Sequence, residues 1–144
     1  MSKRPILAIL ASVVLSGCTA SLASSLSPYT TSISNGPARE LTADEKQVIA
    51  DSLSENIREP AKAKYLWAQL PANAPANGQA HYCAAVNAKS PHAAYSGRQP
   101  YLVQVQISNG RIVSSVVGSI AGGSDMRIVR NLCAKHGLNP DDAV

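Results

Sequence analysis

The chain of 144 residues contains no phenylalanine and only one tryptophan, Trp67. Its core must therefore be filled by small aliphatic side chains, by tyrosine and by this indole, so we expect Trp67 to pack inside it. A chain of this length favours one domain of about 100 residues, which burial alone stabilises only moderately. The shortage of large apolar side chains thus predicts a small domain with a thin core.

Charged side chains are also scarce, at 15% of the residues, and the formal net charge is +4. Lysine and arginine form no long run, and part of the positive charge comes from Lys3 and Arg4. Proteins that bind nucleic acids normally carry clustered basic side chains. We therefore expect no nucleic-acid partner.

The apolar segment near the start of the chain, from Ile6 to Leu15, is too short to cross a bilayer as a helix. It follows Lys3 and Arg4 and is followed by small residues, an order that is typical of an export signal. The pattern predicts that residues 1–17 are a signal peptide.

Leu15-Ser16-Gly17-Cys18 closes this segment and resembles the lipobox of bacterial lipoproteins. The resemblance implies that Cys18 receives a diacylglycerol on its sulfur, becomes the first mature residue and is then acylated on its amino group. Two or more acyl chains, palmitate among them, give stable anchoring. Thr19 stands where inner-membrane lipoproteins typically carry aspartate, so the resemblance points to the outer membrane of a Gram-negative cell, facing the periplasm. The alternative is a buried first helix with an ordinary core cysteine.

The chain has three cysteines, and lipidation of Cys18 leaves the pair Cys83 and Cys133. An exported protein lies in a compartment that oxidises thiols, so one disulfide between them is the simplest outcome. Closing a loop of about 50 residues stabilises a fold by roughly 4 kcal/mol in the chain-entropy model. The alternative is two separate buried thiols.

Composition divides the exported chain into a tether, a domain and a tail. Residues 18–40 are rich in serine, threonine, alanine and proline, and a flexible run of that length spans roughly 25 Å. An edge strand around Ile33 is a weaker alternative. We expect a domain over residues 41–138 and a tail over residues 139–144.

Two helices are expected, one near each end of the domain. Thr42 and Glu45 have the spacing of a capping box, and an apolar stripe through Ile49 continues to a stop at Pro60. Ser124 can cap a second helix, whose apolar stripe includes Met126, Val129, Leu132 and Cys133 and which ends at Gly137.

Four strand candidates lie between the helices. The third of these alternates apolar and polar side chains, and Ser108-Asn109-Gly110 joins it to the fourth with a strong hairpin signal. The candidates cover residues 65–70, 79–87, 101–107 and 111–120.

This order predicts an α+β domain in which a mainly antiparallel sheet packs against helices on one face. Cys83 conflicts with that arrangement, because it alternates with Tyr82 and Ala84 and would face away from the helices. A bulge, or a sheet covered on both faces, removes the conflict.

The segment from Tyr82 to Gly97, together with residues 59–65 and 132–137, resembles a group of small, largely uncharacterised envelope lipoproteins of bacteria. The resemblance covers about residues 41–137 and implies a fold, but it supplies no catalytic residues.

The longest expected loop runs from Ala88 to Pro100 and is the candidate binding site. Its polar side chains could form a lip that binds a peptide, a glycan or the edge of a partner. The alternative is that Asn87 only turns the chain, that Lys89 is solvated, and that Tyr95 and Gly97 pack the loop down. The candidates are Asn87, Lys89, His92, Tyr95 and Arg98.

No metal or cofactor is expected, because His81, His92 and His136 lack the spacing of a zinc site. The chain has no Gly-x-Ser-x-Gly elbow, and its nine carboxylates do not suggest a pair of general acid and base. We therefore expect a non-catalytic binding or assembly module with a protein partner in the envelope. The alternatives are an inhibitor or ligand-binding module that uses the 88–100 loop and, least favoured, a cell-wall hydrolase.

Overall fold

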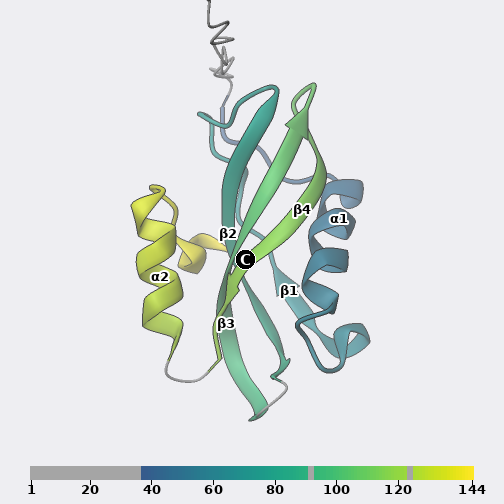
Figure 1. Cartoon of the computed structure of the whole chain (residues 1–144), viewed down its shortest axis with the longest axis vertical. Helices are drawn as coiled ribbons and strands as arrows, with labels where there is room; N and C mark the ends of the chain where they lie inside the picture. Colours follow the sequence, from purple (N-terminus) through teal and green to yellow (C-terminus); the bar gives the residue numbers. More distant parts are fainter. Residues whose placement is uncertain (1–36, 91–92, 123–124) are drawn as a thin grey trace, which may run out of the picture.

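The computed structural model describes residues 37–90, 93–122 and 125–144 (Figure 1). The expected signal peptide, the lipidation site Cys18, most of the tether, and the residues His92 and Ser124 lie outside these ranges. In chain order the elements are α1 (Ala43–Ser54), the 3₁₀ helix η1 (Pro60–Lys62), β1 (Lys64–Leu66), β2 (Gly78–Ser90), β3 (Ala93–Ser108), β4 (Arg111–Ile120), α2 (Met126–Lys135) and the 3₁₀ helix η3 (Pro140–Asp142).

The strands form one antiparallel sheet in the order β1-β2-β3-β4, so each pairs with its neighbour in the sequence. The helices α1 and α2 lie on opposite faces of this sheet (Figure 1). The predicted α+β class is confirmed, but the expectation that both helices cover one face is wrong. Cys83 and Leu102 make part of the second face apolar as well, and that part needs a cover of its own.

The larger core lies between α1 and the sheet. Ile49 and Leu53 of α1 pack with Tyr82, Tyr101 and Val103, and all five side chains are fully buried. A smaller core lies between the other face and α2, where Cys83 and Leu102 meet Val129 and Cys133. The second core resolves the conflict at Cys83, because the sheet is covered on both faces.

The capping box predicted for α1 is present. Thr42 Oγ1 accepts a hydrogen bond from the N–H of Glu45 at 3.3 Å, and Glu45 Oε2 accepts one from the N–H of Thr42 at 2.8 Å. The helix ends at Ser54, before the predicted stop at Pro60. The N–H of Arg58 instead donates to the carbonyl oxygen of Lys89 at 3.2 Å, so contact with β2 determines the path of this segment.

The loop predicted from Ala88 to Pro100 is instead a continuation of the β2–β3 hairpin. β2 runs on to Ser90 and β3 begins at Ala93, with Asn87 opposite Arg98. The inter-strand bonds hold this stretch extended although its composition is that of a loop. The hairpin predicted at Ser108-Asn109-Gly110 is confirmed, because Asn109 and Gly110 both have positive φ angles in the turn between β3 and β4.

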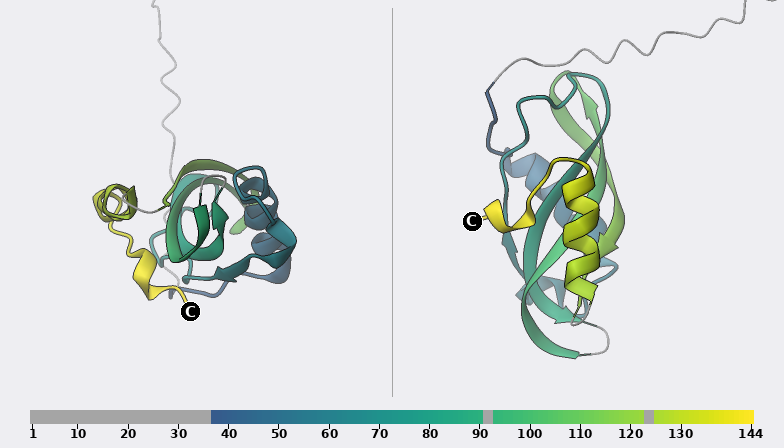
Figure 2. Two further views of the ribbon diagram at one scale, coloured as in Figure 1. Left: turned by 90° about the horizontal axis from the view of Figure 1, so that it is seen from below. Right: turned by 90° about the vertical axis from the view of Figure 1, so that its left-hand side faces the viewer.

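The domain is longer at both ends than predicted, because both flanking segments pair with the chain that follows β1. Arg39 and Leu70 exchange two main-chain hydrogen bonds of 3.1 and 2.7 Å, and Trp67 and Val144 exchange two of 2.9 and 3.1 Å. Residues 139–144 thus run from α2 back to the β1 side of the sheet and are part of the domain, not a tail (Figure 2). β1 itself is shorter than the predicted strand and ends at Leu66.

Candidate functional site

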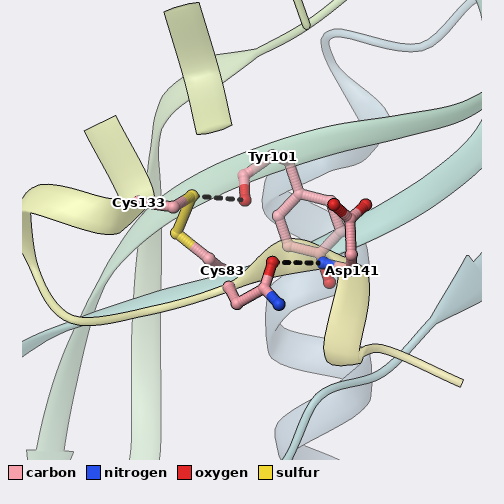
Figure 3. Close-up of a disulfide and its surroundings, with 5 residues drawn as sticks. Cys83, Tyr101, Cys133 and Asp141 are labelled. Atoms are coloured by element: carbon pink, nitrogen blue, oxygen red, sulfur yellow. Dashed lines mark hydrogen bonds between the residues drawn. A yellow bond between two sulfur atoms is a disulfide. The ribbon is translucent and has the colours of Figure 1, made fainter. Parts of the chain in front are cut away.

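Cys83 and Cys133 form the predicted disulfide (Figure 3). Their Cα atoms are 6.0 Å apart, and the bridge joins β2 to α2 across 50 residues of sequence. Both residues are buried, and the Cys133 sulfur lies 3.9 Å from the carbonyl oxygen of Tyr101. The bridge therefore fixes α2 on the sheet at the centre of the smaller core.

Lys89 and Arg98 of the predicted polar lip point to different neighbours, although Arg98 lies opposite Asn87 in the hairpin. Lys89 donates to Glu59 Oε1 at 2.9 Å and ties the hairpin to the segment before η1. Ion pairing with Lys62 and Lys89 lowers the pKa of the Glu59 carboxyl to about 2. Arg98 points to a different neighbour, the carbonyl groups of η3.

Arg98 holds the C-terminal segment of the domain. Its Nη2 donates to the carbonyl oxygens of Pro140 at 3.4 Å and Asp141 at 2.8 Å, and also to that of Ala143. Of the remaining lip candidates, Asn87 is partly buried in β2, whereas His92 and the side chain of Tyr95 lie outside the described atoms. Lys89 and Arg98 thus have structural partners within the domain, whereas the alternative interpretation of the loop expected Lys89 to be solvated.

An ion pair between the buried carboxylate of Glu45 and the partly exposed side chain of Arg39 fixes α1 to the turn between β3 and β4. The two terminal nitrogens of Arg39 donate to the two carboxylate oxygens of Glu45 at 2.8 and 2.7 Å, and Nη2 also donates to the carbonyl oxygen of Gly110. Burial alone would raise the pKa of the Glu45 carboxyl, but hydrogen bonds from Arg39 and from the N–H groups of Thr42 and Ile112 lower it to about 2. The sequence predicted the Glu45 cap, but not its distant partners.

Two adjoining depressions lie beside the chain that follows β1, and we call them together the Gln69 groove. One has a volume of about 290 Å³ and extends toward Tyr82 and the loop after α2, and the other has a volume of about 340 Å³ and extends toward Trp67. Ala68, Gln69 and Asp142 line both. The larger volume falls within the range of about 300–1,000 Å³ that is usual for ligand sites.

Trp67 is only partly buried and forms a wall of the groove, although composition placed it inside the core. Its ring stacks on Tyr65, with centroids 5.5 Å apart and planes inclined by 22°. Lys46 of α1 brings its ammonium group to 5.9 Å from the centroid of Trp67, a cation–π contact. Tyr65 and Trp67 stand two residues apart in a strand candidate, and this spacing was the one sequence signal that the two rings share a face.

Two of the histidines meet on the face of the sheet that α2 covers, at the C-terminal end of this helix. The rings of His81 and His136 stack with centroids 3.7 Å apart, beside a depression of about 170 Å³. Burial and, secondarily, the charge of His136 lower the pKa of His81. Within the described ranges, no group of three or more histidine, cysteine or acidic side chains is arranged to hold a metal ion.

No helix in the described part of the chain is both long and apolar enough to cross a membrane. In comparisons with protein families, curated proteins and solved structures, no match to this chain is found.

Proposed function

We propose that this chain is a lipid-anchored envelope protein whose domain faces the periplasm and binds another envelope component without chemical conversion. The lipobox at Leu15-Ser16-Gly17-Cys18 supports the anchor and the outer-membrane location. The buried bridge between Cys83 and Cys133 supports an oxidising compartment, where structural disulfides persist.

The Gln69 groove carries the binding part of the proposal. Ala38 and Glu40, at the point where the tether enters the domain, are among the residues that line it. The chain between Cys18 and Pro37 has the composition of a flexible linker, and such a linker spans roughly 25 Å. A domain held in this way would present its groove close to the membrane surface while remaining free to reorient.

Hydrogen bonds hold the main chain that forms one wall of the groove in a fixed position. Ala68 is held by Tyr82 and Trp67 by Val144, each through two hydrogen bonds. A surface that is ordered before it binds loses less conformational entropy on association, which favours recognition.

The anchor is tested by mass spectrometry of the N-terminal peptide of the mature protein, isolated from the membrane fraction. We expect Cys18 at the N-terminus with a diacylglycerol and an amide-linked acyl chain. Cys18→Ala, with the rest of the signal unchanged, is the control and should leave the protein unprocessed by the lipoprotein route. An unmodified Cys18 in the wild-type mature protein would contradict the anchor.

The binding function is tested by chemical crosslinking in intact cells that produce the full chain. We expect a reproducible product with one envelope component, in stoichiometric yield. If no envelope component is captured while the protein is lipidated and folded, the proposed binding function is wrong.

A further inference from the structure

The indole of Trp67 offers one face to the Gln69 groove. Tyr65 stacks on the ring with centroids 5.5 Å apart, and Trp67 lines the depression together with Lys46. The ammonium group of Lys46 lies over this ring at 5.9 Å from its centroid, which shows that the ring attracts positively polarised groups, and a ligand that packs on the ring must displace it.

Polar groups of mixed character surround this aromatic face. Gln69 is exposed and its amide can both donate and accept hydrogen bonds, whereas Glu40 and Asp142 bring carboxylates and Lys46 an ammonium group. Asn139 Nδ2 donates to Asp142 Oδ1 at 2.8 Å and so orients that carboxylate. Two carboxylates against one ammonium group disfavour an anionic ligand, and the polar rim disfavours a purely apolar one.

Most of the main chain along the groove is already hydrogen-bonded and does not offer its polar groups to an added peptide strand. The N–H and carbonyl of Trp67 are bonded to Val144, those of Ala68 to the Tyr82 hydroxyl, and those of Leu70 to Arg39. Strand addition depends on a series of such main-chain bonds, so the groove favours recognition through side chains.

We propose that the Gln69 groove binds a saccharide, in the form of the amino-sugar glycan strands of the cell wall. This inference rests on the proposed function and names the ligand of the same groove. A pyranose ring presents C–H groups on its faces and hydroxyl and acetamido groups around its edge. The C–H face packs on Trp67, and the edge groups bond with Gln69, Glu40 and Asp142. The tether entering at Glu40 keeps this groove within reach of a wall that lies next to the membrane.

The single tryptophan makes the test direct, because the indole fluorescence of the whole chain comes from Trp67. Mature protein in detergent is titrated with soluble β-1,4-linked oligomers of N-acetylglucosamine. We expect a saturable change in tryptophan emission. Co-sedimentation with purified, protein-free wall sacculi gives a second readout that does not depend on fluorescence.

Gln69→Ala should weaken oligomer binding about two- to tenfold, the effect of losing one or two hydrogen bonds. Gln104→Ala is the matched control, since Gln104 is also an exposed glutamine but lies on β3 and lines neither depression of the groove. Trp67→Ala, checked for folding by circular dichroism, should abolish co-sedimentation with sacculi. If Trp67→Ala is unfolded, the Gln69 and Gln104 pair decides the test.

Unchanged emission together with no binding to sacculi would overturn the saccharide assignment. A crosslinked protein partner would in that case leave the proposed function standing with another ligand. Equal oligomer binding by wild type and Gln69→Ala would overturn the placement of the saccharide in this groove.

Discussion

Tyr82 holds Ala68 by both of its main-chain polar groups. The Tyr82 hydroxyl accepts a hydrogen bond from the Ala68 N–H at 2.8 Å and donates one to the Ala68 carbonyl oxygen at 2.8 Å. Tyr82 belongs to the core under α1, whereas Ala68 forms part of the Gln69 groove. This contact therefore links the stability of the core to the shape of the groove.

Tyr82→Phe removes both bonds and leaves the N–H and carbonyl of Ala68 without their partner. We expect a loss of about 1–3 kcal/mol in the free energy of unfolding, measured by urea denaturation, because unsatisfied buried polar groups are costly. We also expect weaker binding at the groove.

Tyr101→Phe is the matched control for this prediction. The Tyr101 ring centroid lies 6.4 Å from that of Tyr82, and its buried hydroxyl has no hydrogen-bond partner among the described residues. Removing that hydroxyl should leave stability unchanged or raise it. A larger loss for Tyr101→Phe than for Tyr82→Phe would contradict the hydrogen bonding of both tyrosines.

Removal of the disulfide should cost about 4 kcal/mol, the chain-entropy value for a loop of this length. The comparison is urea unfolding of the wild type and of a Cys83→Ala/Cys133→Ala double variant, with and without reductant. Reductant should destabilise the wild type toward the double variant and should have no effect on the variant itself. Equal stability of both proteins without reductant would show that the bridge does not form.

Acid should destabilise the domain through Glu45. Its pKa is about 2 in the folded protein and has an ordinary value of 4.5, so its contribution is complete above pH 4.5 and is lost as the pH falls toward 2. The difference amounts to roughly 3 kcal/mol. Glu45→Gln should flatten the fall in unfolding free energy over this interval. A profile as steep as that of the wild type would contradict the role of the Arg39 ion pair.

His81 should add a second pH dependence at higher pH. Burial and His136 lower its pKa in the folded protein, so folding favours the neutral ring and stability declines as the pH falls below 6.5. Histidine ring signals in an NMR titration should show His81 titrating below that value. In His136→Gln the pKa of His81 should move back toward it, whereas no change would show that the two rings are not coupled.

Local signals in the sequence predicted much of the fold. The capping box of Thr42 and Glu45 and the Asn109-Gly110 turn depend on residues close together in the chain, and both occur as expected. The pairing of Cys83 with Cys133 was predictable from the cysteine count combined with export.

The features that the sequence did not predict depend on contacts between residues that lie far apart in the chain. Arg98 looked like a loop residue because its partners lie more than 40 residues away, in η3. The groove combines four separate segments, residues 38–46, 67–71, 82–83 and 137–144, and no local periodicity marks such a convergence.

Site-specific photocrosslinking in intact cells tests the central claim most directly. A photoreactive amino acid is placed at position 69 in one lipidated variant and at position 104 in another. The account predicts that the variant carrying it at position 69 is captured on an envelope component, and that the variant carrying it at position 104 is not. Capture from position 104 alone, or equal capture from both positions, would show that the Gln69 groove is not the binding surface.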